Sequence, residues 1–193
     1  MGADNNHSLS NAEYDRRMQR PQKDFEVFLD MDGVLSDFDK HARDHGKFDA
    51  KGQPKWDELD FGWWSTMPAF DGMKKFYEDM KEFGNVRMLT SPTLSTDCFH
   101  GKAEWVKGQW GKWGLRDLII CRAQDKQFLA RPNHILVDDR QKNIDEWTAA
   151  GGIGILHKGD YADTLARVRT AAAAFLNAAP PRVAKPADNP PAP

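Results

Sequence analysis

Short apolar runs alternate with longer segments of periodic apolar residues through the middle of the chain. Five of the short runs have the length and composition of strands: 25–29, 86–89, 117–121, 134–137 and 153–156. This alternation is typical of βαβ units, in which helices cover both faces of a parallel sheet. We therefore predict an α/β protein with a three-layer, Rossmann-like and mostly parallel sheet.

Four segments have the spacing of amphipathic helices. The clearest extends from Phe70 to Phe83, where apolar residues recur mostly at intervals of three and four, and Gly84 follows as a candidate C-cap. Three further segments lie near residues 103–113, 144–150 and 165–176. Each strand is thus followed by a helix or by a gap of helical length, which supports the parallel arrangement.

Three stretches do not follow this alternation. Residues 39–67 are rich in charged and aromatic side chains without a long periodic run, so we expect a small cap inserted between the first and second core strands. Residues 1–23 have little apolar periodicity and residues 179–193 are rich in proline, so we expect both to be disordered arms. The folded domain is predicted to span residues 24–178.

Length and charge exclude some classes of function. A chain of 193 residues with a formal net charge of −2 lacks the basic field that binds a nucleic-acid polymer. No apolar run approaches the roughly 18 residues of a membrane-spanning helix, and no signal peptide is visible. The two cysteines, Cys98 and Cys121, suit neither a zinc site nor a disulfide framework. We expect a cytoplasmic protein without a membrane partner, and its oligomeric state, a homodimer included, stays open.

Polar side chains follow three of the predicted strands at their carboxyl ends, where ligands bind in parallel α/β sheets. These side chains are Asp30 and Asp32, Thr90 and Ser91, and Asp138 and Asp139. Gly33 permits a tight turn directly after Asp32. We therefore expect carboxylates and hydroxyls from three strands to meet at one edge of the sheet.

The motifs around these residues resemble those of the haloacid dehalogenase-like (HAD) phosphohydrolase superfamily. They are Asp30-Met-Asp-Gly-Val-Leu, Leu89-Thr-Ser-Pro and Val137-Asp-Asp-Arg. Within the superfamily, the closest resemblance is to the 5′(3′)-deoxyribonucleotidase family; it extends from Phe25 to about Tyr161 and includes Lys102-Ala-Glu-Trp-Val and Asp125-Lys126. The resemblance implies a phosphatase that hydrolyses nucleoside monophosphates, deoxyribonucleotides included, through an aspartyl-phosphate.

The carboxylates are expected to hold a metal. Four of them at one edge would repel one another strongly unless a divalent cation lay among them, and an all-oxygen site suits Mg²⁺. The resemblance assigns the metal to an oxygen of Asp30, the backbone carbonyl of Asp32 and the carboxylate of Asp138, with Asp139 orienting the metal or its water. It makes Asp30 the nucleophile. Asp32 then protonates the leaving group and later takes a proton from water, which requires a carboxyl that starts protonated, as neighbouring negative charge favours.

A bound phosphate needs hydrogen-bond donors and positive charge. Thr90 and Ser91 offer hydroxyl and backbone N–H groups. Lys126 and Lys102 both match motifs of the family; we prefer Lys126 as the main phosphate-binding lysine and Lys102 as an auxiliary, and the choice stays open. Arg140, next to the acidic pair, matches a family position from which it touches the substrate or braces the loop.

The cap is expected to select the substrate. Trp63 and Trp64 are candidates for stacking on a nucleobase, and core packing is the alternative role. The stretch between Asp32 and Thr90 looks shorter than in deoxyribonucleotidases, which leaves the base and sugar specificity open. Two other functions also stay open: a phosphatase of another small phosphorylated metabolite, and a catalytically idle fold used for interaction.

Overall fold

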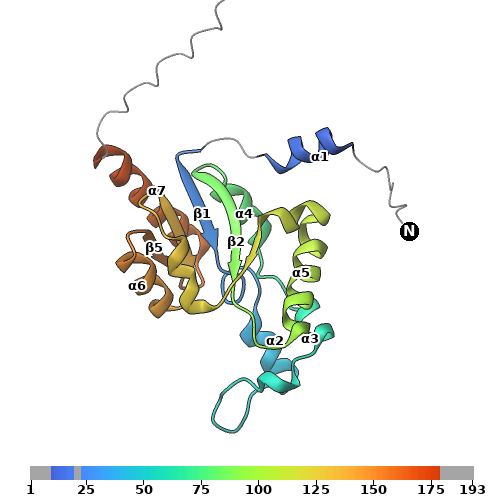
Figure 1. The fold of residues 1–193 in the computed structure, drawn as a ribbon. Helices are drawn as coiled ribbons and strands as arrows, with labels where there is room; N and C mark the ends of the chain where they lie inside the picture. The colour runs from blue at the N-terminus through green and yellow to red at the C-terminus, as the bar shows by residue number, and fades with distance from the viewer. Residues whose placement is uncertain (1–9, 20–22, 179–193) are drawn as a thin grey trace, which may run out of the picture.

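The computed structural model describes residues 10–19 and 23–178, which include one sheet of five strands (Figure 1). The strands are β1 (Phe25–Leu29), β2 (Gly84–Thr90), β3 (Leu118–Ile120), β4 (His134–Asp138) and β5 (Ile153–Leu156). They lie in the order β3-β2-β1-β4-β5, and every pair of neighbours is parallel. The predicted α/β fold class is confirmed, with a sheet that is parallel throughout.

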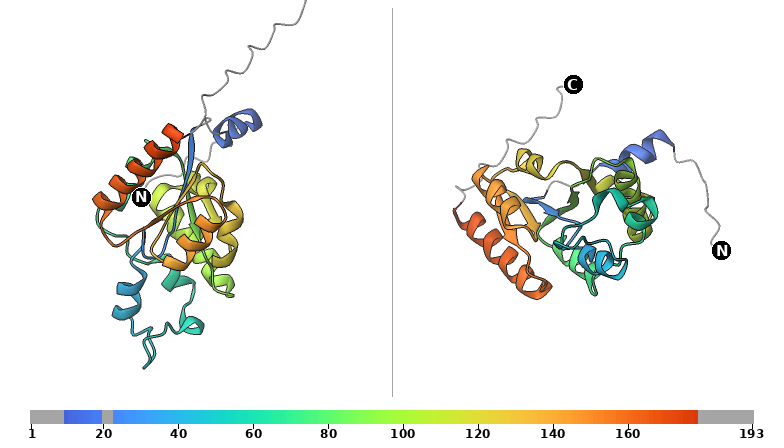
Figure 2. Two further views of the ribbon diagram at one scale, coloured as in Figure 1. Left: turned by 90° about the vertical axis from the view of Figure 1, so that its left-hand side faces the viewer. Right: turned by 90° about the horizontal axis from the view of Figure 1, so that it is seen from below.

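Helices cover both faces of the sheet, as the alternation of apolar segments predicts. Val27 and Leu29 of β1 belong to the core shared with α4 (Met73–Met80), α5 (Thr96–Trp110) and α7 (Tyr161–Ala178). Phe28 lies on the opposite face, in the core shared with α6 (Gln141–Ala149) and the end of the 3-10 helix η3 (Ala123–Leu129). Figure 2 shows α6 and α7 on opposite sides of the sheet. A second 3-10 helix, η2 (Lys112–Asp117), joins α5 to β3.

The predicted amphipathic helix between the first two strands is shorter than its apolar pattern. Its buried residues Met73, Phe76, Tyr77 and Met80 form the stripe in α4. Gly84 is the first residue of β2 and pairs with Phe25, so the prediction that it caps the helix is wrong. A Cβ atom at Gly84 would lie 2.1 Å from the Phe25 carbonyl oxygen, so the close approach of the two strands requires a glycine there.

The segment between β1 and α4 extends beyond the carboxyl edge of the sheet, the edge at which the strands end (Figure 1). It contains α2 (Phe38–Asp44), the 3-10 helix η1 (Trp56–Glu58) and α3 (Phe61–Ser65). Asp37 and Asp60 cap the two α-helices by accepting from the N–H groups of Lys40 and Trp63. Local capping therefore forms helices that are too short to show an apolar period.

A helix also occurs where the sequence predicts an arm without regular structure. Helix α1 (Asn11–Met18) begins after Ser10, whose hydroxyl accepts from the Glu13 N–H at 3.2 Å. This pattern resembles a capping box, a local signal that does not depend on apolar periodicity. The rest of the expected N-terminal arm at residues 1–9 and 20–22, and the proline-rich tail at 179–193, lie outside the described residues. None of the described helices is both long enough and apolar enough to cross a membrane.

Candidate active site

The ends of β1, β2 and β4 bring polar residues together at the carboxyl edge. Strand β1 lies between the other two, and its last residue, Leu29, pairs with Met88 in β2 and Val137 in β4. Asp30 follows Leu29 directly, and Asp138 follows Val137. The register of the sheet therefore places these two predicted site residues side by side.

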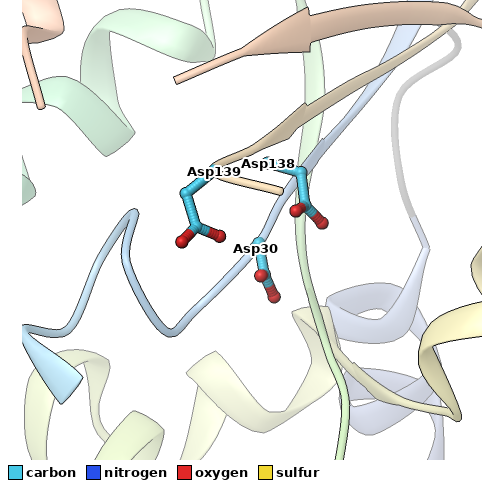
Figure 3. Close-up of side chains that lie close together, drawn as sticks. All are labelled: Asp30, Asp138 and Asp139. Carbon is cyan, nitrogen blue, oxygen red and sulfur yellow. The ribbon is translucent and has the colours of Figure 1, made fainter. Parts of the chain in front are cut away.

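Asp30, Asp138 and Asp139 form an acidic cluster (Figure 3). One oxygen from each carboxylate lies within 4.8 Å of the others. Burial, together with the charges of Asp138 and Asp32, raises the pKa of Asp30 to about 7 against the opposing charge of Lys126. Burial followed by the charge of Asp138 raises the pKa of Asp139 to about 6. Burial and mutual repulsion therefore make it unfavourable for Asp30 and Asp139 to be ionised together with Asp138.

Lys126 partly neutralises this cluster. Its Nζ lies 2.9 Å from Asp30 Oδ1 and 2.8 Å from Asp138 Oδ2, and the residue is only 1% exposed. Burial alone would lower the pKa of Lys126, but the two carboxylates outweigh that effect and raise it above its ordinary value. A lysine has three N–H donors, so one remains beyond these two contacts. That donor can serve an oxygen of a bound phosphate.

Asp138 is fixed by donors from the start of α6. Asn143 Nδ2 lies 3.0 Å and 2.9 Å from its two oxygens, and the Arg140 N–H donates to Oδ1 at 2.9 Å. Sequence reasoning missed Asn143. The available signal was a polar residue directly before Ile144, at the edge of the apolar stripe of the helix.

Asp32 lies on the other side of the carboxyl edge and pairs with Lys102. Asp32 Oδ2 lies 2.6 Å from Lys102 Nζ, which also donates to Thr90 Oγ1 at 2.7 Å and to the Ser91 carbonyl at 2.8 Å. These contacts use all three N–H donors of a fully buried lysine. Lys102 therefore holds Asp32 against the end of β2, and Lys126 is the lysine with a donor to spare.

The turn between the two aspartates needs a glycine. Gly33 has a φ of +82°, and a Cβ atom there would lie 2.4 Å from Asp139 Oδ2. A side chain at this position would be strained by the left-handed backbone and would also displace Asp139. Gly33 thus lets the β1 turn pass close to the acidic cluster.

Ser91 has a buried hydroxyl without a hydrogen-bond partner among the described residues. The residue lines the cleft that opens over the acidic cluster. A buried hydroxyl normally has a partner, so this one is suited to an oxygen of a bound ligand. The expected phosphate-binding role of Ser91 is consistent with this position.

The cleft has a volume of about 1490 Å³. Asp30, Asp32 and Asp139 line it, and the segment between β1 and α4 contributes Phe38 and Trp56. Three arginines, Arg43, Arg122 and Arg140, also line the cleft. It is large enough for a ligand well beyond the size of a phosphate group.

The two tryptophans expected to stack on a base are buried. Trp63 is 6% exposed, is absent from the lining of the cleft, and packs against Phe38 and His41 at ring distances of 5.1 and 4.8 Å. Trp64 is 1% exposed and touches the cleft, with Lys102 Nζ 5.2 Å from its ring centroid. By contrast, Trp56 is 49% exposed and lines the cleft beside Phe38. Sequence reasoning did not single out Trp56 within the cap.

The acidic cluster fits the expected metal. Its three donors are carboxylates, without nitrogen or sulfur, and a hard divalent cation such as Mg²⁺ prefers oxygen ligands of this kind. The side chain of Asp139 is exposed to solvent, whereas Asp30 and Asp138 are buried. A cation can therefore reach the cluster from the cleft while two of its ligands stay fixed.

Comparison with known proteins supports the fold. No family model and no curated protein matches the sequence. The crystal structure of a haloacid dehalogenase-like family hydrolase from Xanthomonas campestris matches 82% of this chain and 97% of its own, with a TM-score of 0.57 and 14% identity. A haloacid dehalogenase-like hydrolase from Burkholderia xenovorans LB400 matches 74% of this chain and 86% of its own, with a TM-score of 0.49 and 13% identity. The first match shows that the chain has the α/β fold of such a hydrolase.

Proposed function

We propose that this chain is a Mg²⁺-dependent phosphomonoesterase that hydrolyses nucleoside monophosphates through an aspartyl-phosphate. One observation carries the proposal: two carboxylates two residues apart, Asp30 and Asp32, line a cleft with different partners. Asp30 belongs to the acidic cluster beside Lys126, whereas Asp32 is held by Lys102. Separate environments for two carboxylates suit separate roles in one reaction.

The first role is that of the nucleophile. An oxygen of Asp30 attacks phosphorus, and the bond between phosphorus and the leaving oxygen breaks. Asp32, in its protonated form, gives its proton to that oxygen, so that the product leaves as an alcohol. The enzyme then holds a phosphoryl group on Asp30.

The second step releases inorganic phosphate. Water attacks the phosphorus, Asp32 takes the proton from the water, and the bond between phosphorus and the Asp30 oxygen breaks. Asp30 is restored as a carboxylate and Asp32 as a carboxylic acid. The same two residues thus complete both half-reactions.

Donors around the carboxylates can hold the phosphoryl oxygens. The remaining N–H of Lys126 and the unpartnered hydroxyl of Ser91 are the leading candidates. Thr90 is held by Lys102, so its backbone and hydroxyl help to position the end of β2. Arg140 lies at the cleft, where its guanidinium can reach the substrate. These groups supply positive charge and hydrogen bonds where negative charge develops.

The metal would be held by Asp30, Asp138 and Asp139, with the Asp32 carbonyl as a further ligand that the family resemblance implies. When bound, Mg²⁺ offsets the negative charge of the phosphate and of the carboxylates that surround it. Asn143 and the Arg140 N–H keep Asp138 in place for this purpose.

The size and aromatic wall of the cleft support a nucleoside as the leaving group. Phe38 and the half-exposed Trp56 both line the cleft, with 5.7 Å between their ring centroids. An exposed aromatic ring in a cleft suits stacking on a planar base. We assign the base platform to Trp56, with the buried Phe38, Trp63 and Trp64 as the packing of the cap.

Phosphate release from a panel of substrates tests the proposal. We expect the protein with Mg²⁺ to hydrolyse nucleoside 5′- and 3′-monophosphates, ribo and deoxy, with higher kcat/KM than sugar phosphates and glycerol phosphate. Preference for a sugar phosphate would instead identify a phosphatase of another metabolite. Absence of phosphate release from every substrate would contradict the enzyme and favour an interaction protein.

A further inference from the structure

We infer that Ser36 is a positioning residue that sets the orientation of the Asp32 carboxyl group for proton transfer to the leaving group. This inference rests on the proposed function. Ser36 is fully buried beneath the turn that follows β1, and its Oγ lies 3.1 Å from Asp32 Oδ1. It is the only hydrogen-bond donor to that oxygen among residues 10–19 and 23–178.

The hydroxyl has two acceptors within reach and a single proton. Its other acceptor is the Met31 carbonyl, at 3.2 Å. That carbonyl already accepts from the N–H groups of Leu35 and Ser36, both at 2.8 Å. Two donors satisfy a carbonyl oxygen, whereas Asp32 Oδ1 has no other donor in the described chain. The hydrogen bond from the Ser36 hydroxyl is therefore more stabilising when Asp32 Oδ1 accepts it than when the Met31 carbonyl does.

The backbone of Ser36 is fixed independently of its hydroxyl. Its N–H donates to Met31, its carbonyl accepts from the Gly33 N–H at 2.8 Å, and the neighbouring Asp37 N–H donates to Pro68. These bonds close the turn through main-chain groups. Loss of the hydroxyl alone should therefore leave the turn in place and free the Asp32 side chain to rotate.

The two oxygens of Asp32 are held by donors of different kinds. Lys102 contacts Oδ2 and can only donate, so that oxygen cannot present a proton to its partner. Ser36 donates to Oδ1. With that bond made, Oδ1 keeps a second lone pair, which can carry the proton toward the leaving group. We therefore assign the proton transfer to Oδ1, with Ser36 as the donor that fixes its orientation.

Dependence on the leaving group distinguishes this role from simple packing. An alkoxide, such as the oxygen of a nucleoside, needs a proton as it leaves, whereas p-nitrophenolate is stable without one. A misdirected Asp32 should therefore slow the hydrolysis of alkyl phosphates and have little effect on p-nitrophenyl phosphate. A general packing defect would slow both.

The experiment compares the full-length Ser36→Ala protein with wild type, in Mg²⁺, on a nucleoside 5′-monophosphate and on p-nitrophenyl phosphate. Ser36→Ala removes one oxygen atom and adds nothing. We expect kcat for the nucleotide to fall about 10-fold or more and kcat for p-nitrophenyl phosphate to change less than about 3-fold. KM should stay within about 2-fold for both substrates, because Ser36 makes no contact with the phosphate site.

Two further variants separate the hydroxyl from packing. Ser36→Thr keeps the hydroxyl and should retain the wild-type ratio of the two kcat values, even if the added methyl group lowers its melting temperature. Thr164→Val removes another fully buried hydroxyl, one that bonds His157 and does not line the cleft, and should leave that ratio unchanged. A crystal structure of Ser36→Ala should show Asp32 in a rotated or divided conformation.

The outcomes are distinct. Equal losses on both substrates, or no loss on either, together with an unmoved Asp32, would overturn the role of Ser36 and leave the phosphatase proposal standing. A wild-type protein that hydrolyses neither substrate would overturn the proposed function, and the inference would fall with it.

Discussion

Within residues 10–19 and 23–178, Lys126 is the one cationic side chain that pairs with both buried carboxylates, Asp30 and Asp138. We predict that Lys126→Met lowers the free energy of unfolding in EDTA by about 3 to 5 kcal/mol, because it leaves buried charge without a partner. Added Mg²⁺ should recover part of the loss. Lys142→Met is the control, since Lys142 is exposed on α6 and should cost less than about 0.5 kcal/mol. A loss below about 1 kcal/mol for Lys126→Met, measured by urea denaturation, would contradict the account.

Trp56 and Trp63 make a matched pair within the cap, one half-exposed and one buried. We predict that Trp56→Ala weakens nucleotide binding by about 1 to 3 kcal/mol, because it removes a stacking surface. The loss should appear as a higher KM for nucleotides, with little change for p-nitrophenyl phosphate. Trp63→Ala should instead lower the melting temperature and affect all substrates, since truncating a buried tryptophan costs about 3 to 5 kcal/mol. Nucleotide-selective loss in Trp63→Ala alone would reverse the two assignments.

The apolar pattern of the sequence placed at the carboxyl edge those site residues that lie at a strand end, whereas Lys102 and Lys126 came from the family resemblance. Asp30, Thr90 and Asp138 follow from the position at which an apolar run stops. Asn143 and Ser36 could not be found this way, because their contacts depend on how a helix start and a turn pack against those strand ends. The exposure of Trp56 likewise depends on the path of the cap, which no periodic pattern specifies.

The turn after β1 is the element on which the site depends most. We predict that Gly33→Ala costs more stability than Gly46→Ala, although both glycines have positive φ. The backbone penalty of about 1 to 2 kcal/mol is common to both variants. Only Gly33 adds a clash with Asp139, because nothing lies within 4 Å of a Cβ atom at Gly46. Equal decreases in melting temperature for the two variants would contradict the predicted clash between a Cβ atom at position 33 and Asp139.

Among the elements, the strands were the most predictable. The runs 25–29 and 153–156 match β1 and β5 at both ends, because apolar residues bounded by polar ones mark a buried strand clearly. Helix α5 begins at Thr96, before its apolar spacing is evident, since Ser95 caps it. The short cap helices and α1 were not predicted at all. Capping side chains determine these ends, and single capping residues are common in loops as well.

At the scale of the whole molecule, the strand order concentrates charge at one place, since β1 lies between β2 and β4. We predict that Mg²⁺ at 100 times its Kd stabilises the fold by about 2.7 kcal/mol, which for a chain of this size raises the melting temperature by about 5 to 10 °C. Asp138→Asn should abolish most of that shift. NaCl at matched ionic strength should give no comparable rise, and an equal rise with NaCl would indicate general screening in place of a metal site.

The proposed function depends on Asp30 as a covalent nucleophile, and trapping the phosphoryl-enzyme tests that role. The protein with Mg²⁺ is mixed with a nucleoside 5′-monophosphate, quenched in acid within milliseconds to seconds, digested and analysed by mass spectrometry. We predict a phosphoryl group on the peptide that contains Asp30. It should be absent from Asp30→Asn and present in Asp37→Asn, in which asparagine still caps α2. Asp30→Asn should also lose several orders of magnitude in kcat while keeping its fold. Full turnover by a folded Asp30→Asn protein, or a phosphoryl group on another residue, would contradict that role.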